Sequence, residues 1–200
     1  MTTELIKKAK LHCQSLIENS RCKGMQFHNW QHTKDVVRNA ILIAKHEKLS
    51  KNTVEEIIIA SYFHDTGNEQ AASGHEQRSC EYAKAFLSQN KFPEECITTV
   101  TKIIKATKMP QHPKTLAQKV ICDADLAHLG KKNFGVKNNS LRNEWEDYSD
   151  MYFTNEKWCT LNISFLKNHR FQTGFAQKYY SQQKLENIKT LKALLPQQEP

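Results

Sequence analysis

Four short segments place histidines and carboxylates inside an otherwise apolar helical pattern. They contain His28 and His32, His64 and Asp65, His75, and Asp123 and Asp125. A buried carboxylate without a partner is costly, so acids at core positions must find a cation or hydrogen-bond donors. Imidazole and carboxylate ligands together suit Mn, Fe, Co, Ni or Zn better than Ca.

These residues also have a purely structural interpretation. A histidine among apolar residues is more often a hydrogen-bonded core residue than a metal ligand, and a His–Asp pair at a helix end can cap that helix. The residues also lie far apart in the sequence. Spacing alone therefore leaves a metal site and a set of structural polar residues as equal alternatives.

The elements that would position these side chains are expected to be helical, because apolar residues recur at helical spacing along the chain. The predicted helices are one ending near Asn19, one carrying Val36 to Ala44, two beginning just after the capping positions Thr53 and Ser73, one from Pro93 to about Thr107, one carrying Val120 to Leu129, and three over about Ser140–Met151, Glu156–Asn168 and Gly174–Leu195. A polar loop is expected over Lys131–Asn139, and no strand is expected. The sequence predicts an all-α fold with one domain over residues 1–195 and a frayed tail, Pro196–Pro200.

Bulk composition bounds the function. The chain of 200 residues carries a net charge of +8, but its lysines are scattered, so a small phosphorylated substrate is favoured over nucleic acid. No apolar run approaches the ~20 residues of a membrane span. The six cysteines form no CxxC pair, which is typical of reduced thiols in a cytoplasmic protein. A homodimer is compatible with the sequence.

The polar segments resemble the H…HD…D signature of the HD-domain superfamily of metal-dependent phosphohydrolases. The resemblance rests on HNWQHT around His32, FHDTG around His64 and Asp65, and CDADLAHLG around Asp125. The later LRNEWE and NHRFQT stretches resemble the C-terminal part of a bacterial subgroup of predicted HD phosphohydrolases. This resemblance implies a single-domain HD-type helical bundle, in agreement with the periodicity.

The resemblance also implies a set of metal ligands: His32, His64, Asp65 and Asp125. Asp125 is chosen because the ligand in related proteins follows a small residue and precedes an apolar one. Asp123 lies about 200° away around the helix, so we expect it to orient a neighbour or cap another helix. The cofactor is a divalent ion (Mn, Fe, Co, Ni, Mg or Zn), and Asp65 would also take a proton from the attacking water.

His28 is the expected general acid, because HNWQH resembles the corresponding segment of cyclic-nucleotide phosphodiesterases. The alternative is a histidine that only packs at a helix start. Two-metal members of the superfamily have two further histidines. His75 stands where the first is expected, whereas Ala106 replaces the second and His112 would have to reach in from a loop. We therefore expect one ion, with His75 binding phosphate or ordering the loop.

Lys105 and Arg142 are the expected phosphate-binding cations, with an ion pair between Arg142 and Glu146 as an equal alternative for the arginine. The predicted function is hydrolysis of a phosphoester in a small phosphorylated substrate, a nucleotide or cyclic nucleotide, by a phosphomonoesterase or phosphodiesterase. The alternative is a non-enzymatic nucleotide-sensing HD module that regulates a partner.

Overall fold

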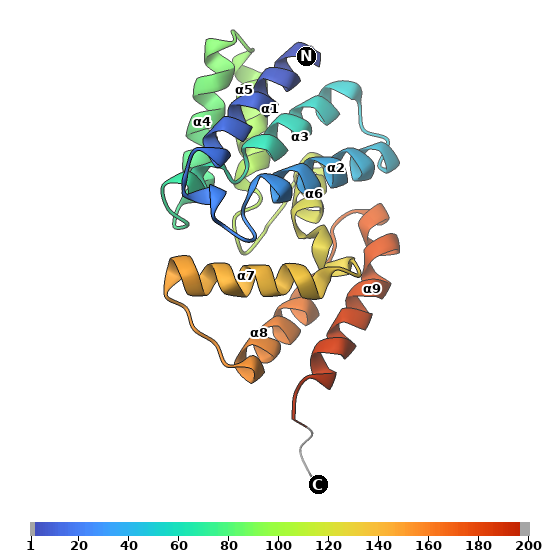
Figure 1. The fold of residues 1–200 in the computed structure, drawn as a ribbon. Coiled ribbons are helices and arrows are strands. Elements are labelled where there is room, and N and C mark those ends of the chain that lie inside the picture. The colour runs from blue at the N-terminus through green and yellow to red at the C-terminus, as the bar shows by residue number, and fades with distance from the viewer. Residues whose placement is uncertain (1–2, 197–200) are drawn as a thin grey trace.

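The structure, a computed structural model, describes residues 3–196 and is helical, with no strand among those residues (Figure 1). Its α-helices are α1 (Thr3–Glu18), α2 (Trp30–His46), α3 (Lys51–Phe63), α4 (His75–Gln89), α5 (Glu94–Lys105), α6 (Leu116–Asp125), α7 (Phe134–Ser149), α8 (Asn155–Asn168) and α9 (Gly174–Ala193). The all-α prediction is confirmed. The expected frayed tail lies outside the described residues except for Pro196. No helix in the described part is long and apolar enough to cross a membrane.

The central helix is α3, which packs against α1, α2, α4, α5 and α6. Because it has neighbours on all sides, its apolar residues are not confined to one stripe: Ile57, Ile59 and Phe63 are all buried. Helices α7 to α9 gather at the other end of the molecule, with α7 lying across the lower side of the N-terminal helices (Figure 1). The His–Asp pair that follows α3 is thereby delivered into the interior.

Helix caps explain where the site residues point, and the capping residues predicted for α3 and α4 were wrong. Asn29 caps α2 by accepting from the backbone of Gln31 and His32, which fixes His32 in the first turn. The cap of α3 is Ser50, because Thr53 occupies the position whose backbone N–H donates to that cap. Helix α4 starts after Gly74, at φ 71°, without a side-chain cap.

Helix α7 begins earlier than expected, inside the segment predicted to be a polar loop. Phe134 is buried and anchors its first turn in the core, while residues such as Asn133 and Gly135 remain exposed. A short 3-10 helix, Leu126–Gly130, connects α6 to this region. The early start places Lys137 and Asn138 on the helix instead of in the polar loop that was expected there.

Asp123 joins α6 to the start of α9. Its carboxylate accepts hydrogen bonds from the backbone N–H of Gln172 (2.8 Å) and of Thr173 (2.7 Å), and from the Thr173 hydroxyl (2.7 Å). Thr173 is itself the N-cap of α9. Of the two roles expected for Asp123, the structure shows that it orients a neighbour, the capping residue Thr173, and this carboxylate is occupied away from the predicted ligands.

Candidate metal centre

Four side chains from three helices converge in the interior. His32 comes from the first turn of α2, His64 and Asp65 follow α3, and Asp125 ends α6. The Asp65 Oδ2 atom lies 3.3 Å from His32 Nε2 and 3.2 Å from His64 Nε2. Asp125 Oδ1 lies 3.3 Å and 3.7 Å from the same two nitrogens. The structure thus brings together all four residues predicted as ligands.

The donor atoms of this cluster are arranged around a common point. His32 Nε2, His64 Nε2 and Asp65 Oδ2 are buried and have no hydrogen-bond partner of acceptable geometry. Ligand atoms about 2.1 Å from an ion lie about 3.0 Å apart at octahedral angles and about 3.4 Å apart at tetrahedral angles. The carboxylate oxygens of Asp65 and Asp125 lie 3.2 to 3.7 Å from the two imidazole nitrogens, which fits a shared cation.

Backbone carbonyls orient the imidazoles toward the cluster. His64 Nδ1 donates to the carbonyl of Ser61 at 2.9 Å, and His75 Nδ1 donates to the carbonyl of Ala72 at 2.8 Å. A proton fixed on Nδ1 leaves Nε2 with a free lone pair, which is the form that binds a metal. Local backbone geometry thus places Nε2 of His64, and not Nδ1, toward the cluster.

The charges of the cluster balance with two protons or with one divalent ion. Burial by itself lowers the pKa of His64, but the Asp65 and Asp125 carboxylates outweigh it and raise this pKa well above its usual range. Burial likewise favours neutral Asp65, yet His64, His32 and His75 hold the pKa of this carboxyl well below its usual range. Replacing the two imidazolium protons by a divalent cation leaves the total charge unchanged.

His75 lies beside the cluster, and its Nε2 atom is 3.4 Å from the second oxygen of Asp65. His112 is exposed, and Gln111 approaches instead, with its Nε2 atom 3.4 Å from Asp125 Oδ2. A neutral amide donor satisfies a carboxylate oxygen without providing a ligand nitrogen, so the described residues favour one ion over two.

His28 precedes α2 instead of lying on it, because Asn29 is the cap. Its ring centroid is nevertheless 5.8 Å from that of His32. The imidazole is bound by a residue that the sequence analysis missed: Glu144 of α7. The Glu144 carboxylate accepts from the backbone N–H of Phe27 (2.7 Å) and His28 (2.8 Å), and lies 2.5 Å from His28 Nδ1. This bond directs His28 Nε2 away from Glu144.

A signal for Glu144 was present in the sequence. Leu141, Glu144, Trp145 and Tyr148 follow the i, i+3, i+4, i+7 spacing of one helix face. An acid on the apolar side of a helix must be paired with a donor or cation. The LRNEWE stretch drew attention to Arg142, whereas the buried acid two residues later contacts the site.

We expect the stability supplied by Glu144 to depend on pH. Burial raises its pKa, but the hydrogen bonds from His28 and the backbone outweigh burial and lower it. A carboxyl with a lowered pKa stabilises the fold above its unfolded pKa, about 4.3, and this contribution is lost as pH falls through the folded value. At pH 7, Glu144→Gln should reduce the free energy of unfolding by roughly 1.5–3 kcal/mol.

Urea unfolding of Glu144→Gln and wild type between pH 3.5 and 8 measures this dependence. The difference between the two proteins should shrink at the acid end. Glu146→Gln, a partly exposed neighbour on the same helix, is the matched control and should show a smaller difference. A difference for Glu144→Gln that is constant across this range would contradict the assigned hydrogen bonds to the Glu144 carboxylate.

The structure does not bring the two predicted phosphate-binding cations to the cluster. Arg142 binds Glu146 (3.0 Å), Asn155 Oδ1 (2.7 Å) and the carbonyl of Phe153, on the side of α7 that faces α8. It lies about 200° around the helix from Glu144. Lys105 is exposed at the end of α5 and lines neither pocket beside the cluster. Arg142 therefore makes the ion pair with Glu146 that was the alternative to phosphate binding.

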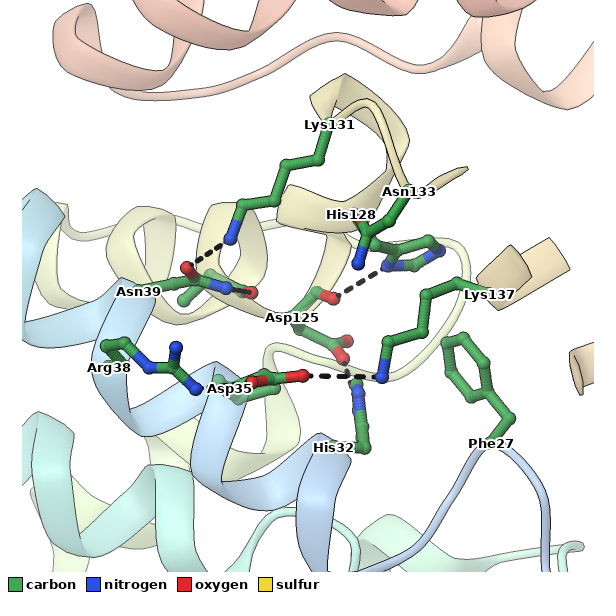
Figure 2. Close-up of a pocket in the computed structure, with 12 residues that line it drawn as sticks. Phe27, His32, Asp35, Arg38, Asn39, Asp125, His128, Lys131, Asn133 and Lys137 are labelled. Atoms are coloured by element: carbon green, nitrogen blue, oxygen red, sulfur yellow. Dashed lines mark hydrogen bonds and ion pairs between the residues drawn. The ribbon is translucent and has the colours of Figure 1, made fainter. Parts of the chain in front are cut away.

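Two pockets adjoin the cluster. One has a volume of about 180 Å³ and is lined by His28, His75, Asn68 and Glu144 among others. The second, of about 140 Å³, includes His32 and Asp125 in its wall (Figure 2). A substrate group bound at the cluster can therefore extend in two directions.

Comparison with known proteins identifies the fold. No family model and no curated protein matches the sequence. A predicted HD superfamily hydrolase from an uncultured Thermotogales bacterium shares 19% identity at a TM-score of 0.62, covering 94% of this chain and 89% of its own. The Lin1889 protein of Listeria innocua shares 18% identity (TM-score 0.68; 98% and 100% covered). YpgQ of Bacillus subtilis, solved in complex with ADP, shares 15% identity (TM-score 0.68; 97% and 96% covered). The chain therefore has the fold of these structures, an HD-type helical bundle.

Proposed function

We propose that this protein is a metal-dependent phosphohydrolase that acts on a small phosphorylated substrate, a nucleotide being the favoured class. The observation that carries the proposal is the buried convergence of His32, His64, Asp65 and Asp125, in which three polar atoms make no hydrogen bond of acceptable geometry. A purely structural role would satisfy these atoms with well-formed hydrogen bonds, as the Asp123 carboxylate is satisfied. The unsatisfied donor set suits one divalent ion of the transition series.

The four ligands would hold this ion, which would supply Lewis acidity to a water molecule and to a phosphoryl oxygen. Asp65 would accept the proton that the attacking water loses as its oxygen bonds to phosphorus. His28 would donate a proton to the leaving oxygen as the phosphorus–oxygen bond breaks. Glu144 positions His28 for this step, and His75 contacts the substrate phosphate. The products are an alcohol, or a second phosphate, and the released phosphate.

Nucleotide substrates are supported by two features. The pockets on both sides of the cluster leave room for groups on either side of a bound phosphorus. One structure of the same fold, YpgQ, binds ADP. The alternative function, nucleotide sensing without turnover, has no need of a proton donor such as His28 next to the metal ligands.

A hydrolysis screen tests the proposal. The protein is stripped with a chelator and assayed for phosphate release from nucleoside mono-, di- and triphosphates, cyclic nucleotides and simple phosphoesters, with Mn, Fe, Co, Ni, Mg and Zn added separately. We expect activity that requires an added metal and is lost again with chelator. Nucleotide binding without turnover under every metal would support the sensing module instead.

A further inference from the structure

The pocket next to His32 and Asp125 contains an excess of positive charge. Figure 2 shows Lys131 ending beside Asn39 and Lys137 ending beside Asp35, with Arg38 on the other side of Asp35. One acid other than the proposed ligand lines this pocket: Asp35. It is shared, because its carboxylate lies 2.6 Å from Arg38 and 3.3 Å from Lys137 Nζ.

Lys131 has no carboxylate partner within the described part of the chain. Its Nζ atom donates to Asn39 Oδ1 at 2.6 Å, and Asn39 in turn donates to the carbonyl of Ala124, the residue before Asp125. The same ammonium group lies 5.8 Å from the centre of the Tyr180 ring. The lysine is thus held in one place, next to the backbone of a proposed metal ligand.

The environment of Lys131 is short of negative charge. Burial lowers its pKa, Asp35 raises it, and the positive charges of Arg38 and Lys137 lower it further. An anion entering this pocket would therefore gain from two ammonium groups, because its charge offsets their mutual repulsion. The ammonium group of lysine is a compact positive charge with several N–H donors, and phosphoryl oxygens accept hydrogen bonds from such a group.

The size of the pocket limits what can enter it. Its volume of about 140 Å³ is well below the roughly 300–1,000 Å³ of pockets that enclose drug-sized ligands. A phosphoryl group fits such a volume. Because His32 and Asp125 belong to its wall, a group bound here lies next to a phosphorus bound at the cluster.

We propose that Lys131 and Lys137 form a subsite for a second phosphoryl group, so that the preferred substrate carries adjacent phosphoryl groups, as in a nucleoside diphosphate or triphosphate. A phosphomonoester and a cyclic monophosphate leave this subsite empty. The substrate preference inferred here rests on the proposed phosphohydrolase activity. The affinity of the pocket for a diphosphate can be measured without turnover.

The kinetic test compares AMP with ADP in the metal-loaded protein. Lys131→Met and Lys137→Met should each raise the KM for ADP about 10- to 100-fold, as expected for a lost charged hydrogen bond, and should change kcat/KM for AMP less than about threefold. Lys132→Met is the matched control: it removes the same charge next to Lys131 but lines a different pocket. An equal loss with both substrates, or no loss with ADP, would overturn the subsite.

A binding test separates this inference from the proposed function. Calorimetry of the metal-loaded protein should show tighter binding of pyrophosphate than of orthophosphate, with the preference lost in Lys131→Met and Lys137→Met and kept in Lys132→Met. If no substrate is hydrolysed but this pattern holds, the subsite stands and the phosphohydrolase fails. If hydrolysis occurs but neither lysine substitution weakens pyrophosphate binding, the subsite is contradicted and the phosphohydrolase is not. Lys131→Arg should retain the preference, which guards against a folding defect.

Discussion

Asp65→Asn should abolish metal-dependent phosphate release, with a loss of at least about 10³-fold in kcat. Asp65 contacts every imidazole of the centre: one oxygen lies 3.3 Å from His32 and 3.2 Å from His64, and the other lies 3.4 Å from His75. Its amide isostere keeps the volume but removes a ligand charge and the proposed proton acceptor. Steady-state phosphate release across a range of metal concentrations measures the loss.

Asp123→Asn is the control for this result. Asp123 is as buried as Asp65, but its carboxylate binds the start of α9. We expect Asp123→Asn to lower the free energy of unfolding by roughly 1–3 kcal/mol and to leave kcat of the folded protein unchanged. Full activity in Asp65→Asn, or equal losses in both variants, would contradict the assignment of Asp65 to the reaction.

His28→Gln should lower kcat about 10²- to 10⁴-fold for substrates with a poor leaving group, such as an alkyl phosphate. The reason is that an alkoxide must be protonated as it departs, and His28 is the proposed donor. A nitrophenolate leaves readily without a proton, so the same variant should lose far less activity toward nitrophenyl phosphate. The ratio of the two losses is the quantity to measure.

Two variants sharpen this experiment. Glu144→Gln should show the same dependence on the leaving group with a smaller loss of activity, because Glu144 positions His28 without touching the substrate. His46→Gln removes a histidine at the other end of α2, packed on Phe175 at 4.4 Å between ring centres, and should leave both rates unchanged. A loss in His28→Gln that is equal for both substrates would assign His28 to binding or packing.

The fold could be predicted because each helix carries its own apolar spacing. The errors lie at helix starts, where a single residue decides at which position the helix begins. Ser50 and Thr53 are both good caps, and only the observed backbone shows which one accepts and which one donates. Phe134 extended α7 into an apparently polar segment, because burial of one aromatic side chain outweighed the polarity of its neighbours.

The cluster was predictable from its motifs, and the helix geometry correctly predicted that Asp123 points away from it. The remaining site residues depend on tertiary contacts that local spacing does not encode. Glu144 reaches His28 across 116 positions of sequence, and Lys131 reaches Asn39 across 92. The expected arginine and lysine were chosen for their charge, but charge says nothing of which side of a helix faces the cluster.

The metal content of the purified protein tests the central claim most directly. Wild type, Asp123→Asn and Asp125→Asn are loaded with Mn or Zn, desalted and analysed by elemental mass spectrometry. The site described above predicts one ion per chain in wild type and in Asp123→Asn, and a large loss in Asp125→Asn. A wild-type protein that retains no ion after loading, or an Asp125→Asn variant that retains as much as wild type, would contradict it.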